Sequence, residues 1–255
     1  MVDGERLTFD AMGLYNGVFA MADRQSGSVW THLEGKAIQG TSTGTTMAII
    51  PILHTTWGEW LKLHPDTTVL DPDTPFSSQY RPVTIGMSGL GPGFVQSLLS
   101  WDPRLPDGTI VVGVTSGDVS QAYALDILVE GLGAVNDILG ELPIVVFHDK
   151  AKAFGIAYSR VLDGDTLTFS ATGGRIVDDE TGTTWNQEGV AVDGPLAGQR
   201  LEFVTSFITE WYGWAAFHPS TGIYKEAETQ ALLGTGSAEP SARGDSFGGF
   251  GGGRR

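Results

Sequence analysis

Two stretches of the sequence, WGEWLKLHPDT at 57–67 and WYGWAAFHPST at 211–221, carry two tryptophans three residues apart followed by His-Pro. Positions i, i+3, i+4 and i+7 share one face of a helix, so this spacing predicts a short helix in each stretch. The residue before a proline is disfavoured in the helical region, so each helix should end at its histidine. We therefore expect His64 and His218 to be the C-caps of two equivalent helices.

The residues around these stretches repeat as well. VDGERLTF at 2–9 matches LDGDTLTF at 162–169, and DRQSGSVW at 23–30 matches DDETGTTW at 178–185. From Gly35 to the end of the helices the two copies keep one offset of 154 residues, the separation of His64 and His218. Matches in the same order at a nearly constant offset predict an internal duplication.

The expected fold class is α+β, built mainly of antiparallel β hairpins with short helices. Two pseudo-symmetric repeat units are joined by a central β-helix-β segment, and together they make a single globular domain over 1–224. The expected parts are repeat unit one at 1–70, a connecting segment at 71–142, repeat unit two at 143–224 and a flexible Gly/Ser-rich tail at 225–255.

Strands are expected on both sides of the helices. TMAIIPIL at 46–53 and RLEFVTSF at 200–207 are strand-like and lead to threonines, Thr56 and Thr209, that suit helix N-caps. Asp-Gly pairs favour type I′ hairpin turns, but only Met1 and Val2 precede the first of them. We expect that opening hairpin not to form.

Three elements are expected between the two repeated stretches. Residues 109–125 are predicted to form a hairpin, 126–137 a short helix with an Asn-Asp turn, and 143–149 a buried strand.

Charge is the strongest compositional signal. Thirty Asp and Glu against fifteen Lys and Arg give a formal net charge of −15 and a pI near 4.5. Such a surface repels nucleic acid phosphates, so we expect no nucleic acid partner. Self-repulsion that salt screens, together with scarce lysine, favours a halophilic protein over an ordinary acidic one.

Other classes are excluded by what the sequence lacks. It contains no cysteine, which excludes a thiol nucleophile or thiolate metal site. No apolar run is long enough to span a membrane, and the first residues do not resemble a signal peptide. Localisation stays open: cytoplasmic if Met1 is the true start, exported if a signal precedes it.

The candidate site residues come from the repeated stretches and one acidic turn. The candidate ligand-binding residues are His64, His218, Trp57, Trp60, Trp211 and Trp214. The candidate metal ligands are His64, His218, Asp178 and Asp179.

Each of these candidates also has a structural interpretation. Histidine is favourable at a helix C-terminus, and aromatic pairs at helical spacing usually pack in a core, here at the junction of the units. Aspartates of this kind usually cap turns. His32, His54 and His148 could join a ligand set in space, although no metal-binding spacing is present.

Two familiar motifs fail. The glycine-rich stretch GMSGLGPGF at 86–94 lacks the lysine of a phosphate-binding loop, and leucine at position 90 breaks the GxSxG pattern of serine hydrolases.

The segments LTF, DRQSGSVW and GKAIQG, followed by VDDETGTTW, GVAVDGPLAGQRL and WYGWAAFHPSTGIY, resemble the domain of unknown function 3179 family over roughly 1–224. The resemblance implies bacterial or haloarchaeal origin and no established activity. Similar members carry a Cys-Pro-Leu type segment upstream of the first Asp-Gly hairpin, and this chain lacks it. An N-terminally truncated member is therefore expected.

Three functional hypotheses follow. A non-enzymatic or degenerate binding module is favoured, because no nucleophile, phosphate loop or ligand spacing is evident. A metal-dependent or redox enzyme with a site between the two repeat units is the first alternative. The second is a structural partner that self-associates or recruits another chain by β-augmentation at an unpaired strand edge. The sequence identifies no cofactor.

Overall fold

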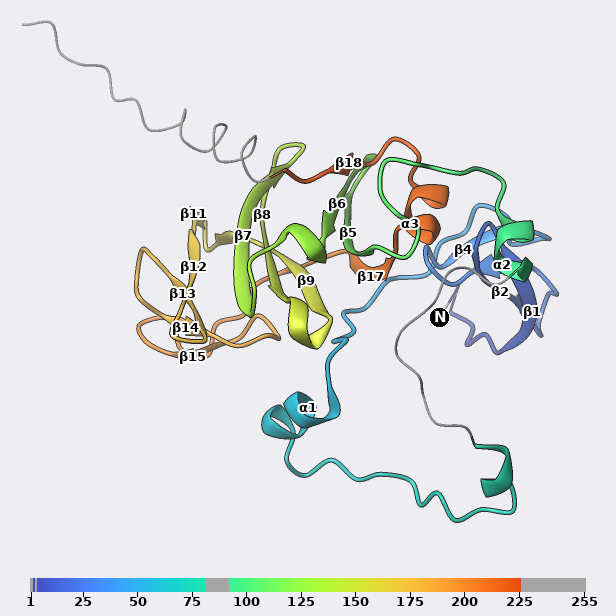
Figure 1. Cartoon of the computed structure of the whole chain (residues 1–255), viewed down its shortest axis with the longest axis horizontal. Helices are drawn as coiled ribbons and strands as arrows, with labels where there is room; N and C mark the ends of the chain where they lie inside the picture. Colours follow the sequence, from blue (N-terminus) through green and yellow to red (C-terminus); the bar gives the residue numbers. More distant parts are fainter. Residues whose placement is uncertain (1, 3, 81–91, 226–255) are drawn as a thin grey trace, which may run out of the picture. The chain divides into compact units, whose positions relative to one another are not determined.

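Two four-stranded antiparallel meanders form, one within residues 1–70 and one within residues 143–224, the ranges called the first and second unit below (Figure 1). The first consists of β1 (Phe9–Tyr15), β2 (Val18–Asp23), β3 (Val29–Thr31) and β4 (Lys36–Gln39). The second consists of β12 (Phe169–Thr172), β13 (Arg175–Asp178), β14 (Thr184–Trp185) and β15 (Ala191–Asp193). The computed structural model describes residues 2, 4–80 and 92–225.

The two meanders share strand order and register. Phe9 lies opposite Asp23 and Trp30 opposite Met21 in the first. In the second, Phe169 lies opposite Asp178 and Trp185 opposite Ile176. The β1–β2 hairpin is longer than β12–β13. This length difference explains why the offset falls from 160 residues, between Phe9 and Phe169, to 155, between Asp23 and Asp178.

In both meanders a phenylalanine, a tryptophan and an aspartate at equivalent positions contact one another. A phenylalanine ring meets the tryptophan edge-on, with ring centroids 6.0 Å apart in the first sheet and 5.8 Å in the second. The indole N–H of Trp30 donates to Asp23 Oδ2 at 2.8 Å, and that of Trp185 donates to Asp178 Oδ2 at 2.9 Å. The indole bond is the main reason that the pKa of Asp23 is lowered. These buried carboxylates tie each central strand to the turn that follows it.

Two further four-stranded sheets form the remaining core. One has the order β16-β9-β8-β7 and the other β17-β5-β6-β18. Their strands are β5 (Ile110–Ser116), β6 (Val119–Ala124), β7 (Leu132–Leu139), β8 (Leu142–Asp149), β9 (Phe154–Ser159), β16 (Phe203–Val204), β17 (Ser206–Glu210) and β18 (Gly222–Ile223). Fully buried valines such as Val112 and Val146 pack between the sheets.

Short elements complete the fold. The helices are α1 (Trp57–Leu63), α2 (Pro92–Ser97) and α3 (Trp211–Phe217). Single 3₁₀ turns lie at Ser77–Gln79, Leu125–Ile127 and Lys150–Lys152, and a two-residue hairpin pairs β10 (Val161–Leu162) with β11 (Asp165–Thr166). Within the described part of the chain, no helix is long and apolar enough to cross a membrane.

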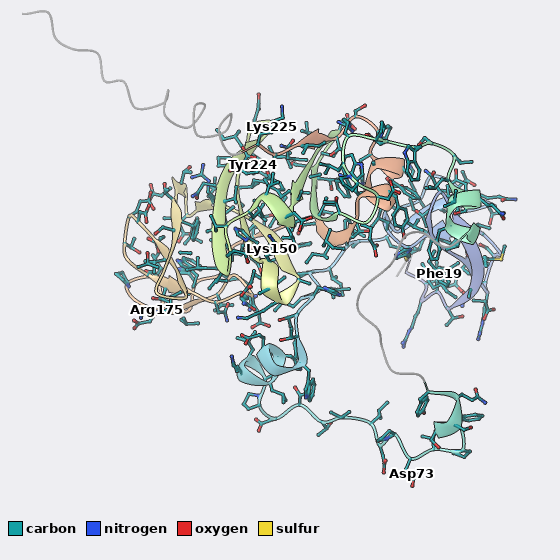
Figure 2. The ribbon with its side chains drawn as sticks, viewed as in Figure 1. Phe19, Asp73, Lys150, Arg175, Tyr224 and Lys225 are labelled. Atoms are coloured by element: carbon teal, nitrogen blue, oxygen red, sulfur yellow. The ribbon has the colours of Figure 1, made fainter. Side chains whose placement is uncertain are left out.

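Met1–Tyr224 form one compact unit. The side chains over this unit are drawn in Figure 2. The expected flexible tail lies outside the described residues except for Lys225, as does most of the glycine-rich stretch at 86–94.

The predicted hairpin at 109–125 and the buried strand at 143–149 are confirmed as β5–β6 and β8. The helix predicted between them, at 126–137, is wrong. Only a 3₁₀ turn forms there, and strand β7 follows. The side chain of Asn136 bonds both backbone polar groups of Phe169, at 2.7 and 2.9 Å, so it links two strands instead of forming a turn.

The strand predicted at 46–53 is also wrong in the first unit. Thr46 makes one isolated bridge to Lys36, and the described residues 47–56 form no helix or strand. In the second unit the corresponding chain becomes β16 and β17 because β9 and β5 lie beside it. An extended segment needs a neighbouring strand to complete its hydrogen bonds.

Two local predictions also need correction. Thr56 caps α1 by accepting from the Glu59 backbone N–H at 3.3 Å, but Thr209 lies in β17 and the N-cap of α3 is Glu210. Val2 and Glu5 form a single isolated bridge, so a minimal hairpin forms where none was expected.

Candidate functional site

Helix α3 is held by the sheet that contains β5. Trp211 and Trp214 are fully buried. Trp214 lies flat on β5 at Gly113, where an added Cβ would be 2.2 Å from the indole ring. The indole N–H of Trp214 donates to Thr221 Oγ1 at 3.0 Å. A glycine in the strand thus creates the space that fixes the helix.

This packing fixes His218 at the end of the helix. Its backbone N–H donates to the Trp214 carbonyl at 2.9 Å, as expected of a C-cap. The imidazole stacks on the indole of Trp214 with ring centroids 4.0 Å apart. Nε2 is buried and has no hydrogen-bond partner among the described residues. Burial lowers the pKa of His218 to about 4, so the ring is neutral at pH 7.

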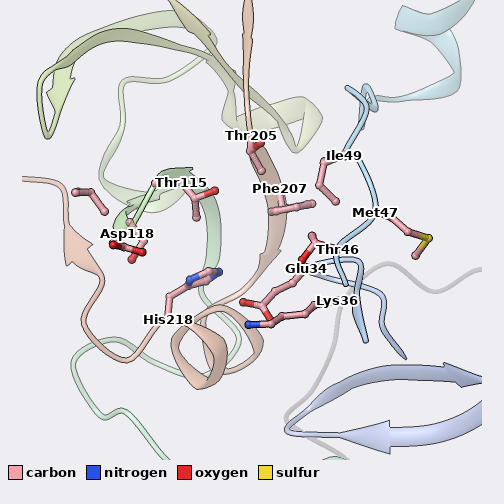
Figure 3. A pocket seen from close by; sticks show the side chains of 13 residues that line it. Glu34, Lys36, Thr46, Met47, Ile49, Thr115, Asp118, Thr205, Phe207 and His218 are labelled. Carbon is pink, nitrogen blue, oxygen red and sulfur yellow. The ribbon is translucent and has the colours of Figure 1, made fainter. Parts of the chain in front are cut away.

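His218 lines a pocket of about 580 Å³. Glu34 and Lys36 line it from the turn before β4 and from the start of that strand, opposite His218. Figure 3 shows the Glu34 carboxylate and the imidazole pointing toward the same space, with Lys36 beside Glu34. Burial raises the pKa of Glu34, and the nearby Lys36 opposes this rise.

The rest of the wall is partly apolar and partly hydroxylic. Met47, Ile49 and Phe207 supply the apolar part, and the hydroxyls come from Thr46, Thr115, Ser120 and Thr205. The pocket therefore combines residues of both repeat units with the β5–β6 turn. Its lining includes two carboxylates, Glu34 and Asp118, together with an ammonium, a neutral imidazole and several hydroxyls.

His64 occupies the corresponding place on α1. Its ring stacks on Trp60 with centroids 4.2 Å apart, and its backbone N–H donates to the Trp60 carbonyl at 2.8 Å. Unlike His218, it has a partner: Nε2 lies 3.2 Å from Glu188 Oε1 of the second unit. The structure does not bring His64 and His218 to one site.

The four tryptophans do not share one role. The prediction that both pairs are core residues at the junction of the units is wrong for Trp57, which is 52% exposed. Trp211 and Trp214 are core residues, but they pack with Val111 and Ala122 of β5 and β6. Helix α1 contributes no buried residue. Trp60 is half-buried and donates its indole N–H to Thr67 Oγ1 at 2.9 Å.

The acidic turn has a structural use. Both oxygens of the Asp178 carboxylate accept hydrogen bonds, from Thr181 at 2.7 Å and from Trp185 at 2.9 Å. Asp179 accepts from Ser170 Oγ at 2.8 Å. Across residues 2, 4–80 and 92–225, no group of three histidines or carboxylates is placed to hold a metal ion.

The other histidines lie apart from the pocket. His32 and His54 face backbone carbonyls, Phe19 O at 3.0 Å and Ala153 O at 3.2 Å. His148 is fully buried, and burial lowers its pKa to about 4. Neither ring nitrogen of His148 has a partner in the described structure.

Glu34 and Lys36 were not identified from the sequence. A signal for Glu34 was available, because Glu34 and Glu188 stand at the same offset of 154 residues as the two histidines. Lys36 has no such counterpart, since position 190 is valine. Only the fold shows that each glutamate faces the histidine of the other unit.

No curated protein and no solved structure matches the chain. The family model described as protein of unknown function (DUF3179) matches residues 1–221, and the chain therefore belongs to this family.

Proposed function

We propose that this protein is a binding module that holds a small polar molecule in the pocket between Glu34 and His218. The observation that carries the proposal is that His218, whose buried Nε2 has no partner among the described residues, lines a pocket of about 580 Å³. Ligand pockets commonly measure roughly 300–1,000 Å³ and combine an apolar lining with a few placed polar groups. A buried polar atom without a partner costs stability, and a ligand would supply its missing hydrogen bond.

Binding is favoured over catalysis by the state of these two groups. A catalytic base is usually oriented by a hydrogen bond to a neighbouring group. Neither ring nitrogen of His218 has such a bond to any described residue. A hydrogen-bonding contact to a ligand requires only the neutral imidazole that the fold provides.

The site also supports the internal duplication. The meanders share register, and the two helices share their Trp–Thr bonds and Trp–His stacking. We infer that one ancestral unit was copied in tandem and that the copies pack so that each places its histidine against the other's glutamate.

A thermal-shift screen of small acids, amines, amino acids and sugars tests the binding proposal. Affinity for any compound found should fall at least about tenfold, equivalent to about 1.4 kcal/mol, in His218→Gln and in Phe207→Trp. His32→Gln is the matched control, because His32 is exposed and lies outside the pocket. Binding that survives both pocket variants unchanged would contradict the proposal.

A second candidate function rests on residues 47–56. Ile50 and Ile52 are 70% and 78% exposed, and this stretch lacks the strand neighbours that its counterpart in the second unit has. An extended apolar segment with free backbone groups can accept a strand from another chain. Size-exclusion chromatography in high salt should then show a species larger than a monomer that Ile50→Lys and Ile52→Lys return to monomer. A monomeric unmodified chain would contradict this candidate.

A further inference from the structure

A second pocket, of about 380 Å³, lies where Trp60 of the first unit faces Glu188 and Arg200 of the second. Leu53 and Phe203 supply its apolar wall. His64 does not line the pocket itself, but its ring stacks on Trp60 and its Nε2 lies 3.2 Å from Glu188 Oε1, and both of these residues do.

Part of the second pocket corresponds to the first with the units exchanged, whereas the β5–β6 turn of the first pocket and Trp60, Tyr158 and Glu202 of the second have no counterpart. At the offset of 154 residues, Glu34 corresponds to Glu188 and His64 to His218. The apolar wall corresponds in the same way. The matched pairs are Ile49 with Phe203, Met47 with Leu201, and Leu53 with Phe207. Each pocket thus takes its glutamate from one unit, and a histidine of the other unit lines the first pocket and contacts the glutamate of the second.

Each pocket contains one cation, and the two cations come from opposite members of the same bridged pair of positions. Lys36 forms an isolated bridge with Thr46, and Val190 forms the corresponding bridge with Arg200. In the first unit the cation is Lys36, the earlier residue of the bridged pair. In the second unit it is Arg200, the later residue of the pair. The exchange keeps one positive charge beside each glutamate although the aligned residues differ. A cation at this bridge is therefore common to both pockets.

We propose that Glu188, Arg200 and His64 form a second ligand site, and that both sites bind a small zwitterion of the amino-acid type. This inference rests on the binding function proposed above. A carboxylate and a cation side by side match the ammonium and carboxylate groups of such a molecule. The imidazole contributes one further hydrogen bond, and the apolar wall accommodates a short side chain. A ligand in the second site competes with the His64–Glu188 contact, so that site is the weaker of the two.

Calorimetric titration of the full chain with alanine, propionate and ethylamine tests the ligand class. Propionate lacks the ammonium of alanine, and ethylamine lacks its carboxylate. Alanine should bind at two sites of unequal affinity, and each single-charge probe should bind at least about tenfold more weakly. Propionate binding as tightly as alanine would overturn the zwitterion assignment, and so would the absence of alanine binding.

Single variants test the second site. Glu188→Gln and Arg200→Gln should each remove the weaker alanine site and leave the stronger one, whereas Glu34→Gln should do the reverse. Arg200 is exposed, so its variant serves even if Glu188→Gln is poorly folded. Glu130→Gln, at an exposed glutamate outside both pockets, should keep both sites. One alanine site that is lost in Glu34→Gln and unaffected in Glu188→Gln and Arg200→Gln would overturn the second site and leave the proposed function intact.

Discussion

Helices α1 and α3 have the same tryptophan spacing, the same indole-to-threonine bond and the same stacked histidine, but they differ in what surrounds them. Helix α3 packs two fully buried indoles on the β5 sheet, and α1 buries no residue. The shared sequence determines the helix and its C-cap. The neighbouring sheet determines whether that helix is part of the core.

The largest expected effect comes from replacing the second tryptophan of each helix, Trp60 in α1 and Trp214 in α3. Trp214→Ala should lower the free energy of unfolding by about 3–5 kcal/mol, because a fully buried indole leaves a cavity. Trp60→Ala, at the half-buried counterpart, should cost clearly less than this. Urea unfolding followed by circular dichroism measures both. Equal losses would show that α1 is packed as firmly as α3.

The glycine beneath Trp214 should give the next largest effect. Gly113→Ala should destabilise the protein by about 1–3 kcal/mol, because the added Cβ overlaps the indole. Gly58→Ala in α1 meets nothing within 4 Å in the described structure. It should instead stabilise the helix by roughly 0.5–1 kcal/mol. Thermal unfolding of both variants checks this pair, and a neutral Gly113→Ala would contradict the packing described for α3.

Acid should reveal the burial of His218. The folded-state pKa of His218 is lowered to about 4 from 6.5, so the unfolded chain binds a proton more readily in that range. His218 therefore makes the free energy of unfolding fall as the pH drops from 6.5 toward 4, by up to about 3 kcal/mol. The raised pKa of Glu34 acts in the opposite direction.

The comparison of the unmodified protein with His218→Gln isolates the contribution of this histidine. Urea unfolding at several pH values should show a flatter profile between pH 6.5 and 4 in the variant. His148→Leu should flatten the profile in the same range, because burial also lowers the pKa of His148 to about 4. A His218→Gln profile parallel to that of the unmodified chain would mean that the imidazole is not buried as described.

Salt should distinguish the two helices least, because it screens charges over the whole acidic surface. With a net charge of −15, we expect the melting temperature to rise between 0.1 M and 3 M KCl as repulsion is screened. Trp60→Ala and Trp214→Ala should rise in parallel with the unmodified chain. An unchanged melting temperature would contradict the proposed adaptation to high salt.

Much of the local structure could be predicted because it depends on nearby residues. The Trp spacing and His-Pro ends predicted both helices. The errors arose where distant partners decide. Residues 46–53 have strand-like composition but lack a neighbouring strand, and Asn136 and Asp137 suit a turn in sequence yet bond across to Phe169 and Tyr123.

The candidate site was predicted only in part. Both histidines were identified from their position in the repeat. The glutamates that face them lie on the opposite unit, and Glu188 is 124 residues from His64. The offset between the repeats could have paired the two glutamates. The exchange of the cation between positions 36 and 200 could not have been found without the bridges that place Lys36 opposite Thr46 and Arg200 opposite Val190.

The most direct test is thiol cross-linking, which is clean because the chain has no cysteine. In one double variant Glu34 and His218 are both replaced by cysteine, and in another Glu188 and His64 are. A short bifunctional thiol reagent should join the two cysteines of each variant under native conditions. Pairs drawn from a single unit, Glu34 with His64 or Glu188 with His218, should not be joined. Efficient cross-linking of the pairs within one unit, and none between units, would contradict the reciprocal arrangement on which both pockets depend.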